Sequence, residues 1–184
     1  MKKLFGVFVF SLLLTAHFTQ TVNAQTDEVM RIAQLIAWGE IQFEAGDYDS
    51  AINAFTEVIK IEPNLFWTVY MWRGDAYYRK DDFDSAIVDY TQVIRLQPNH
   101  ANAFSTRGEA YMRKSDWNRA IADLTQALQL QPNDAASHLF RGISYSNKGD
   151  YDRAITDLEA VLRLNPNDST ARQWLDALRQ ARGR

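Results

Sequence analysis

Residues Ala101–Asp134 read ANAFSTRGEAYMRKSDWNRAIADLTQALQLQPND, and the fold can be predicted from this segment. Its key residues recur 34 positions away on both sides. The recurring residues are a glycine, an alanine and a proline: Gly74, Gly108 and Gly142; Ala86, Ala120 and Ala154; Pro98, Pro132 and Pro166. Recurrence at such a period is the signature of a chain built from stacked copies of one structural unit.

Each copy predicts a pair of helices. Gly108 and Ala120 are small, so the two helices of a hairpin can approach closely at these positions. The bulky residues recur at helical spacing and are expected to fill the space between the helices: Tyr111, Trp117, Leu124 and Leu128. Asp116 precedes the second helix, where its carboxylate can accept hydrogen bonds from free backbone N–H groups. Pro132 ends that helix.

A further copy lies upstream and is one residue out of phase, with Gly39, Ala51 and Pro63 at the key positions. An aromatic residue opens each second helix: Tyr48, Phe83, Trp117 and Tyr151. A tyrosine follows the glycine by three positions as Tyr77, Tyr111 and Tyr145, with Gln42 in the first copy. We number the copies as repeats one to four, over residues 32–66, 67–100, 101–134 and 135–168.

This pattern resembles the tetratricopeptide repeat family over residues 32–168. The resemblance implies an all-α fold, a right-handed α-solenoid of four helix hairpins. It also implies a protein-interaction scaffold without catalytic activity, whose concave face binds a peptide, a helix or another protein. The identity of that partner is not encoded in the repeat pattern.

Helical periodicity predicts the bounds of the individual helices. The expected ranges are 27–45 and 48–61 in repeat one, 68–80 and 83–96 in repeat two, and 136–148 and 151–164 in repeat four. Residues 169–181 are predicted to form a capping helix. Its apolar side would face repeat four through Trp174, Leu175 and Leu178, while Arg172, Arg179 and Arg182 would lie largely on the other sides.

Repeats two to four depart from the family in one respect. The residue before the glycine is usually leucine in the family, but here it is Arg73, Arg107 and Arg141. An aspartate follows each arginine by 16 positions: Asp89, Asp123 and Asp157. Repeat one has Trp38 and Ala54 at these places. We predict an arginine–aspartate pair between the helices of repeats two to four, and a large–small packing pair in repeat one.

The resemblance implies that certain positions of each first helix line the concave groove. The expected partner-binding residues are Glu40, Phe43, Glu44, Met71, Trp72, Asp75, Tyr78, Arg79, Asn102, Ser105, Glu109, Met112 and Arg113. Equivalent positions are held by Ile36, Thr68, Thr106, Leu139, Phe140, Ile143, Ser146 and Asn147. Aromatic residues and methionines beside charges suit an adaptable protein-binding surface. Two alternatives stay open: the acids and arginines form ordinary i,i+4 helix pairs, or neighbouring helices cover Trp72 and Phe140.

Some members of the family bind chaperone C-termini through a clamp of lysines, asparagines and an arginine. The matching positions here are Ile36, Glu40, Trp72, Asn102 and Thr106. Only Asn102 has a side chain of the clamp type, and Glu40 would repel a carboxylate. We therefore expect no carboxylate clamp.

Charge is distributed unevenly along the chain. Residues 25–66 carry eight acidic and two basic residues, whereas residues 135–184 carry eight basic and six acidic ones. A solenoid keeps sequence order as spatial order, so one end should be acidic and the other mildly basic. This gradient would orient a partner with a basic segment or drive weak head-to-tail self-association. The alternative is a solvated surface that serves solubility.

Met1–Ala24 lies outside the repeats and has the layout of a secretory signal peptide. Lys2 and Lys3 precede an apolar run over residues 4–16, and small residues precede an expected cleavage before Gln25. The run is shorter than the roughly 20 residues that a membrane span needs. We expect an exported protein, periplasmic or secreted. An uncleaved anchor, and with it a membrane-tethered component of an envelope assembly or secretion complex, is the alternative.

Composition narrows the possible chemistry. The 184 residues include no cysteine, which excludes disulfides, thiolate metal sites and a cysteine nucleophile. The formal net charge of −3 gives no support for nucleic-acid binding. His100 and His138 are the histidines beyond the expected signal, and neither has a metal-ligand spacing. We expect no catalytic residue, no metal and no cofactor, and we expect a structural role for His138.

Overall fold

The structure is a computed structural model that describes residues 26–64 and 67–182. The regular elements of these residues are all α-helices, in line with the predicted fold class. A helix over residues 26–44 comes first. It is followed by α2 Tyr48–Ile61, α3 Trp67–Arg79, α4 Phe83–Leu96, α5 Ala101–Arg113, α6 Trp117–Leu130, α7 Ala135–Asn147, α8 Tyr151–Leu164 and α9 Ser169–Arg182. The bounds of α2, α4 and α8 agree with those expected, and α3 and α7 begin one residue earlier.

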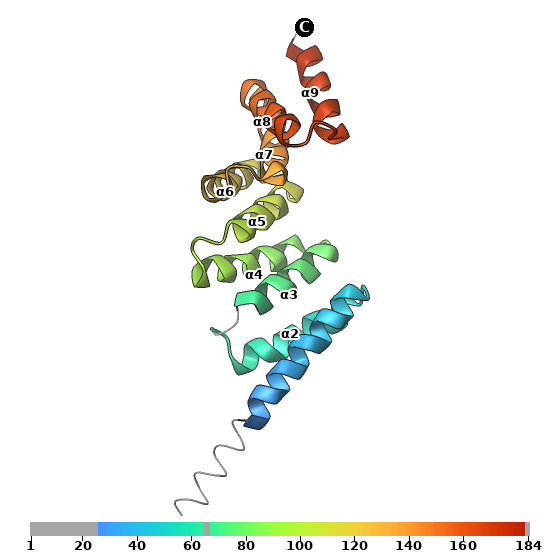
Figure 1. Ribbon diagram of the computed structural model, residues 1–184, viewed down its shortest axis with the longest axis vertical. Helices are drawn as coiled ribbons and strands as arrows, with labels where there is room; N and C mark the ends of the chain where they lie inside the picture. Colours follow the sequence, from blue (N-terminus) through green and yellow to red (C-terminus); the bar gives the residue numbers. More distant parts are fainter. Residues whose placement is uncertain (1–25, 65–66, 183–184) are drawn as a thin grey trace, which may run out of the picture.

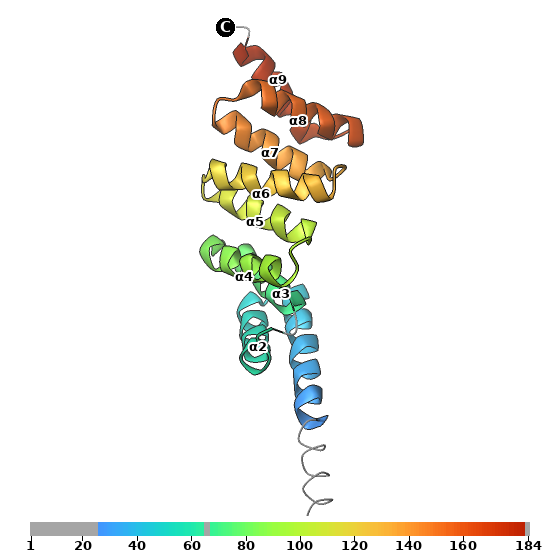
Figure 2. The same cartoon turned by 90° about the vertical axis from the view of Figure 1, so that its left-hand side faces the viewer.

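The helices are stacked in chain order along the long axis of the molecule (Figures 1 and 2). Helices that follow one another in the chain from α2 onward are packed together. The first helices of neighbouring repeats also touch, because α5 contacts α7 and α7 contacts the capping helix α9. No comparable contact joins the second helices α2, α4, α6 and α8 within the described part of the chain. The first helices therefore form the more closely spaced side, which we call the inner face.

An aspartate caps every second helix, as expected. Asp47, Asp82, Asp116 and Asp150 each accept a hydrogen bond from the backbone N–H three residues later, at 3.1–3.3 Å. The turn before each cap needs one residue with positive φ. Glycine supplies it in repeats one and four, whereas Asp81 and Ser115, both with φ of 59°, supply it in repeats two and three. Because a side chain is disfavoured in this region, these two turns carry a small local strain.

The glycine that recurs in each repeat marks a close approach between the two helices of the hairpin. A Cβ atom on Gly39 would lie 2.6 Å from Phe55 Cε1, and one on Gly108 would lie 2.8 Å from Leu124 Cγ. These distances are shorter than real van der Waals contacts. The repeated alanine that faces the same region is fully buried in repeats one to four: Ala51, Ala86, Ala120 and Ala154. The prediction that small residues allow close helix packing is confirmed.

The hydrophobic core is divided among the interfaces between neighbouring helices. One cluster joins the helix 26–44, α2 and α3 through Ile32, Phe55 and Val69. Another joins α8 to α9, where Ala171, Leu175 and Leu178 of α9 are buried and Trp174 is packed against them. Arg172 and Arg179 of α9 are exposed. The predicted division of α9 into an apolar and a solvated side is confirmed.

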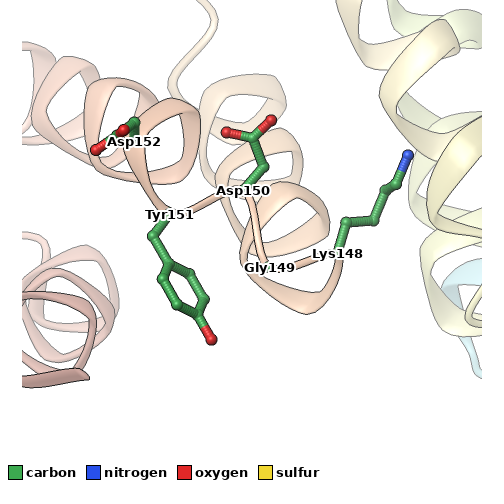
Figure 3. A pocket seen from close by; sticks show the side chains of 5 residues that line it. All are labelled: Lys148, Gly149, Asp150, Tyr151 and Asp152. Carbon is green, nitrogen blue, oxygen red and sulfur yellow. The ribbon is translucent and has the colours of Figure 1, made fainter. Parts of the chain in front are cut away.

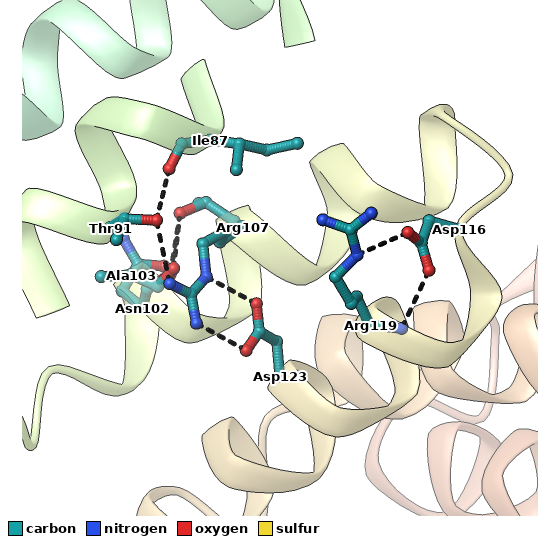
Figure 4. A network of polar contacts seen from close by, with 9 residues as sticks. Ile87, Thr91, Asn102, Ala103, Arg107, Asp116, Arg119 and Asp123 are labelled. Atoms are coloured by element: carbon teal, nitrogen blue, oxygen red, sulfur yellow. Dashed lines mark hydrogen bonds and ion pairs between the residues drawn. The ribbon is translucent and has the colours of Figure 1, made fainter. Parts of the chain in front are cut away.

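The predicted arginine–aspartate pairs are present in repeats two to four. Arg73 Nε and Nη2 donate to the two oxygens of Asp89 at 2.8 and 2.7 Å. Arg107 binds Asp123 in the same way at 2.7 and 2.8 Å (Figure 4). Arg141 binds Asp157 at 2.8 Å twice. These bidentate pairs join the first helix of a repeat to its second helix.

Each arginine also makes a third contact that the sequence did not predict. Its Nη1 donates to a threonine on the second helix of the preceding repeat, at 3.0–3.2 Å: Thr56 for Arg73, Thr91 for Arg107 and Thr125 for Arg141. One guanidinium therefore ties together three helices from two repeats. His138 joins the last of these networks, with Nδ1 2.8 Å from Asp157 Oδ1 and Nε2 3.1 Å from the Pro132 carbonyl oxygen. This confirms its structural role.

The packing pair predicted for repeat one is wrong. Ala54 is buried, but 55% of the Trp38 surface is exposed. Trp38 is the repeat-one equivalent of the three arginines. Each of those arginines contacts a threonine on the second helix of the repeat before its own. Among the described residues no repeat precedes repeat one, so the indole is not covered in this way.

The predicted signal peptide lies outside the described residues. In residues 26–64 and 67–182, none of the helices combines the length and apolar character that crossing a membrane requires.

Candidate functional site

A pocket of about 390 Å³ opens on the inner face between repeats one, two and three. It collects side chains from four helices: the helix 26–44, α3, α4 and α5. Its lining residues are Phe43, Asp75, Tyr78, Arg79, Tyr90, Thr106 and Glu109. Side chains of several repeats meet here, so the solenoid stacking itself builds the pocket.

Two tyrosine–carboxylate hydrogen bonds hold the pocket together. The Tyr90 hydroxyl on α4 donates to Asp75 Oδ1 on α3 at 2.8 Å. The Tyr78 hydroxyl on α3 donates to Glu109 Oε1 on α5 at 2.7 Å, which links repeat two to repeat three. Each carboxylate therefore has one oxygen engaged by a neutral donor and a second oxygen left as an acceptor.

Burial dominates the electrostatics of the pocket. It raises the pKa of the Asp75 carboxyl from its ordinary 3.8 to about 6, against the opposing effects of the Tyr90 hydrogen bond and of Arg79. Burial, followed by the effect of Glu109, raises the pKa of Tyr78, and burial followed by Asp75 raises the pKa of Tyr90. Both phenols are consequently neutral donors at physiological pH, while Asp75 becomes mostly charged above pH 6.

Aromatic contacts fix the ring that walls the pocket on the repeat-one side. Phe43 packs edge-on against Trp72, with ring centroids 5.1 Å apart, and against Tyr48 at 5.5 Å. On the repeat-two side, Tyr78 packs edge-on against Phe83 at 5.3 Å. These edge-on contacts orient the aromatic rings on both sides of the pocket.

The structure brings together five of the expected groove residues in this pocket: Phe43, Asp75, Tyr78, Arg79 and Glu109. Other expected residues are exposed or half-buried outside its lining: Glu40, Glu44, Asn102, Met112 and Arg113. Met71 and Trp72 are half-buried and pack against hydrophobic clusters between repeats. This favours the alternative interpretation of the sequence, in which neighbouring helices cover Trp72.

Ser105 lies in a contact between two repeats. This residue is only 7% exposed, and its Oγ lies 2.8 Å from Ser137 Oγ. The two hydroxyls join α5 to α7, where the first helices of repeats three and four touch. Ser105 is therefore part of the contact between repeats, and its role in partner binding stays a prediction.

The two acids of the groove are hydrogen-bonded to tyrosines and not to the arginines of the expected i,i+4 pairs. Asp75 is bonded to Tyr90 and Glu109 to Tyr78, rather than to the arginines four residues further along. Arg113 instead lies 3.6 Å from Asp81 and covers the Phe83 ring at 5.4 Å from the centroid.

Tyr90 is the lining residue that the sequence interpretation missed. It belongs to a second helix, its surface is 1% exposed, and its hydroxyl donates to Asp75 in the pocket. A signal was present in the sequence. The equivalent positions of the other repeats hold Phe55, Leu124 and Leu158, so Tyr90 adds a polar group where the others are apolar.

A second pocket, of about 450 Å³, lies at the turn between α7 and α8 (Figure 3). Its lining consists of five consecutive residues, Lys148–Asp152, with the Lys148 side chain extended toward Asn118 of α6. A single turn forms this hollow, so it lacks the convergence of elements found on the inner face. Within the described ranges, histidine, aspartate and glutamate side chains form no group of three that could hold a metal ion.

Stacked helix hairpins with a 34-residue period and a ligand-sized pocket on the inner face define an α-solenoid of the protein-interaction class. Three family models match the chain: a tetratricopeptide repeat over residues 33–65, a TPR repeat over 74–115 and a tetratricopeptide repeat over 109–179. Together they cover more than half of the sequence. The matches and the fold place the chain among the tetratricopeptide-repeat proteins.

Solved structures agree with this assignment. A crystal structure of MamA protein has a TM-score of 0.79 at 24% identity and 83% coverage of both chains. MamA residues 41 to the end from Desulfovibrio magneticus RS-1 gives 0.80 at 18% identity, with 83% of this chain and 86% of that one covered. The first TPR of Spaghetti (RPAP3), bound to the HSP90 peptide SRMEEVD, gives 0.63 at 26% identity and covers 64% of this chain and 94% of its own. No curated protein sequence matches the chain.

Proposed function

We propose that this protein is a scaffold that binds a segment of a partner protein on its inner face. The pocket between repeats one, two and three carries this proposal, since it gathers polar and aromatic side chains from four helices at one place. The RPAP3 domain supports it, because a similar array of hairpins is bound to an HSP90 peptide in that structure. The proposal assigns the chain no catalytic step and no cofactor.

Site-specific photo-crosslinking tests the proposed face. A photoreactive phenylalanine analogue placed at Thr106, which lines the pocket, is expected to crosslink the partner in the native compartment. The same analogue at Val88, which is 59% exposed on the second helix α4, serves as the matched control. Products from position 106 and none from position 88, identified by mass spectrometry, would support inner-face binding. Equal products from both positions, or products from position 88 alone, would refute it.

Export belongs to the same proposal. The two lysines, the apolar run of residues 4–16 and the small residues before Gln25 support a cleaved signal peptide and a periplasmic or secreted scaffold. Intact-mass measurement of the protein from its native compartment is expected to show a chain that begins at Gln25. A retained Met1–Ala24 segment would instead support the membrane-tethered component of an envelope assembly.

A further inference from the structure

We propose that the inner-face pocket binds one basic side chain, an arginine or a lysine, of the partner segment. This inference rests on the proposed function, because it names the chemistry that the inner face recognises. It commits the pocket to a cationic group from a protein and not to a terminal carboxylate.

Charge is the first argument. Asp75 and Glu109 reach the pocket from neighbouring repeats, and Arg79 is the one cation in its lining. Both acids occupy the position after the helix glycine, which is also acidic in repeat one as Glu40 but apolar in repeat four as Ile143. The acidic positions therefore coincide with the three repeats that form the pocket. An incoming carboxylate would meet two like charges, whereas a cation would meet a net negative site.

Hydrogen-bonding capacity is the second argument. Tyr90 engages one oxygen of Asp75, and Tyr78 engages one oxygen of Glu109. The remaining carboxylate oxygens are acceptors, and no buried side-chain polar atom of the described residues lacks a partner. The free acceptor capacity thus faces accessible space. A guanidinium offers five N–H donors and an ammonium offers three, so either group can use these oxygens.

Shape is the third argument. The volume of about 390 Å³ accommodates a side chain with its adjoining backbone. Phe43 and Tyr78 supply aromatic surface to the same pocket that holds the acids. Arginine and lysine have apolar stems that pack on such rings, and their charged ends are attracted to ring faces. The pocket combines both requirements of a basic side chain.

The test uses the full chain and a matched pair of small probes: N-acetyl-arginine amide and its neutral isostere N-acetyl-citrulline amide. Titration followed by NMR is expected to give saturable shifts for the arginine probe at Asp75, Tyr78 and Glu109, with a millimolar Kd. The citrulline probe is expected to bind at least tenfold more weakly. Equal affinity for the two probes, or shifts that avoid the pocket, would overturn the proposal.

Substitutions of the acidic and basic residues that line the pocket should change the affinity for arginine in opposite directions. The double variant Asp75→Asn with Glu109→Gln is expected to weaken arginine binding at least tenfold, and Arg79→Gln is expected to strengthen it by removing the competing cation. Asp176→Asn, an exposed change on α9, is the control and should leave the affinity unchanged. If the double variant does not fold, Glu109→Gln alone replaces it. Unaltered affinity in the pocket variants would contradict the inference.

The pH dependence gives an independent readout on the unmodified chain. Asp75 faces Arg79, Glu109 and the Tyr90 hydroxyl, and burial raises the pKa of its carboxyl to about 6. It is about 10% ionised at pH 5 and almost fully ionised at pH 7.5, so arginine should bind up to about tenfold more tightly at the higher pH. Asp75→Asn should abolish this rise. If the partner crosslinks at position 106 but the arginine and citrulline probes bind equally well, the inference of a basic side chain is overturned. Binding of a partner on the inner face would still stand.

Discussion

Removal of residues 169–184 is expected to lower the free energy of unfolding by about 4–6 kcal/mol and to cause aggregation. Leu175 and Leu178 are each 4% exposed, and burial of one leucine side chain contributes about 2–3 kcal/mol. The truncation would also uncover Leu158 and Val161 of α8, which are now fully or almost fully buried. A solenoid depends on stacking between neighbours, so its end must present a polar side to water.

Urea unfolding followed by circular dichroism and sedimentation velocity would measure both effects. Leu175→Ala with Leu178→Ala is the less drastic version, and it should lower stability by a similar amount without shortening the chain. Gln173→Ala with Gln180→Ala changes the exposed side of the same helix and should have little effect. A truncated chain with unchanged melting and solubility would show that α9 is not a cap.

Arg73→Ala is expected to cost about 3–5 kcal/mol, because it leaves a buried carboxylate without its partner. Asp89 is 1% exposed and accepts two hydrogen bonds from this arginine. The change also removes the link to Thr56 on α2, so it loosens the contact between repeats one and two. The exposed pair of Arg153 and Asp150 is the matched control, since water screens such a surface pair and its loss should cost far less.

The pH dependence of this variant has a defined sign. Burial raises the pKa of Asp89 in the folded protein, and Arg73 counteracts that rise. Without the arginine, the folded state favours the protonated acid more strongly than the unfolded chain does. The loss in free energy of unfolding caused by Arg73→Ala should therefore be largest at pH 7.5. It should shrink as the pH falls through the raised pKa of Asp89. Urea unfolding at pH 7.5 and pH 5 tests this.

Replacement of both Arg73 and Asp89 separates the effect of an unpaired buried charge from the effect of lost packing. Arg73→Leu with Asp89→Leu removes both charges, so most of the lost stability should return. If Arg73→Ala costs no more than Arg153→Ala, the buried pair has no special role. If the double leucine variant is as unstable as Arg73→Ala, the loss comes from packing rather than from the unpaired charge.

The helices, their caps and the arginine–aspartate pairs of repeats two to four could be predicted from the sequence alone. A helix starts at Asp116 and ends before Pro132 for local reasons, because backbone N–H groups need an acceptor and proline cannot continue the helix. The pairing of Arg107 with Asp123 was also predictable, because the two positions change together from repeat to repeat and lie on the two helices of one hairpin. The signal peptide remains a prediction.

The contacts between repeats could not be predicted from the sequence, because they depend on how the repeats are stacked. Helical periodicity states which side of a helix is buried, but it does not state how far the neighbouring helix stands or what covers the flanks. That spacing buries Ser105 against Ser137 and leaves Trp38 exposed. It also brings the hydroxyl of Tyr90, a core residue of a second helix, to Asp75. The pocket depends on contacts across hairpins and repeats, and such contacts follow from the stacking geometry rather than from the pattern within one repeat.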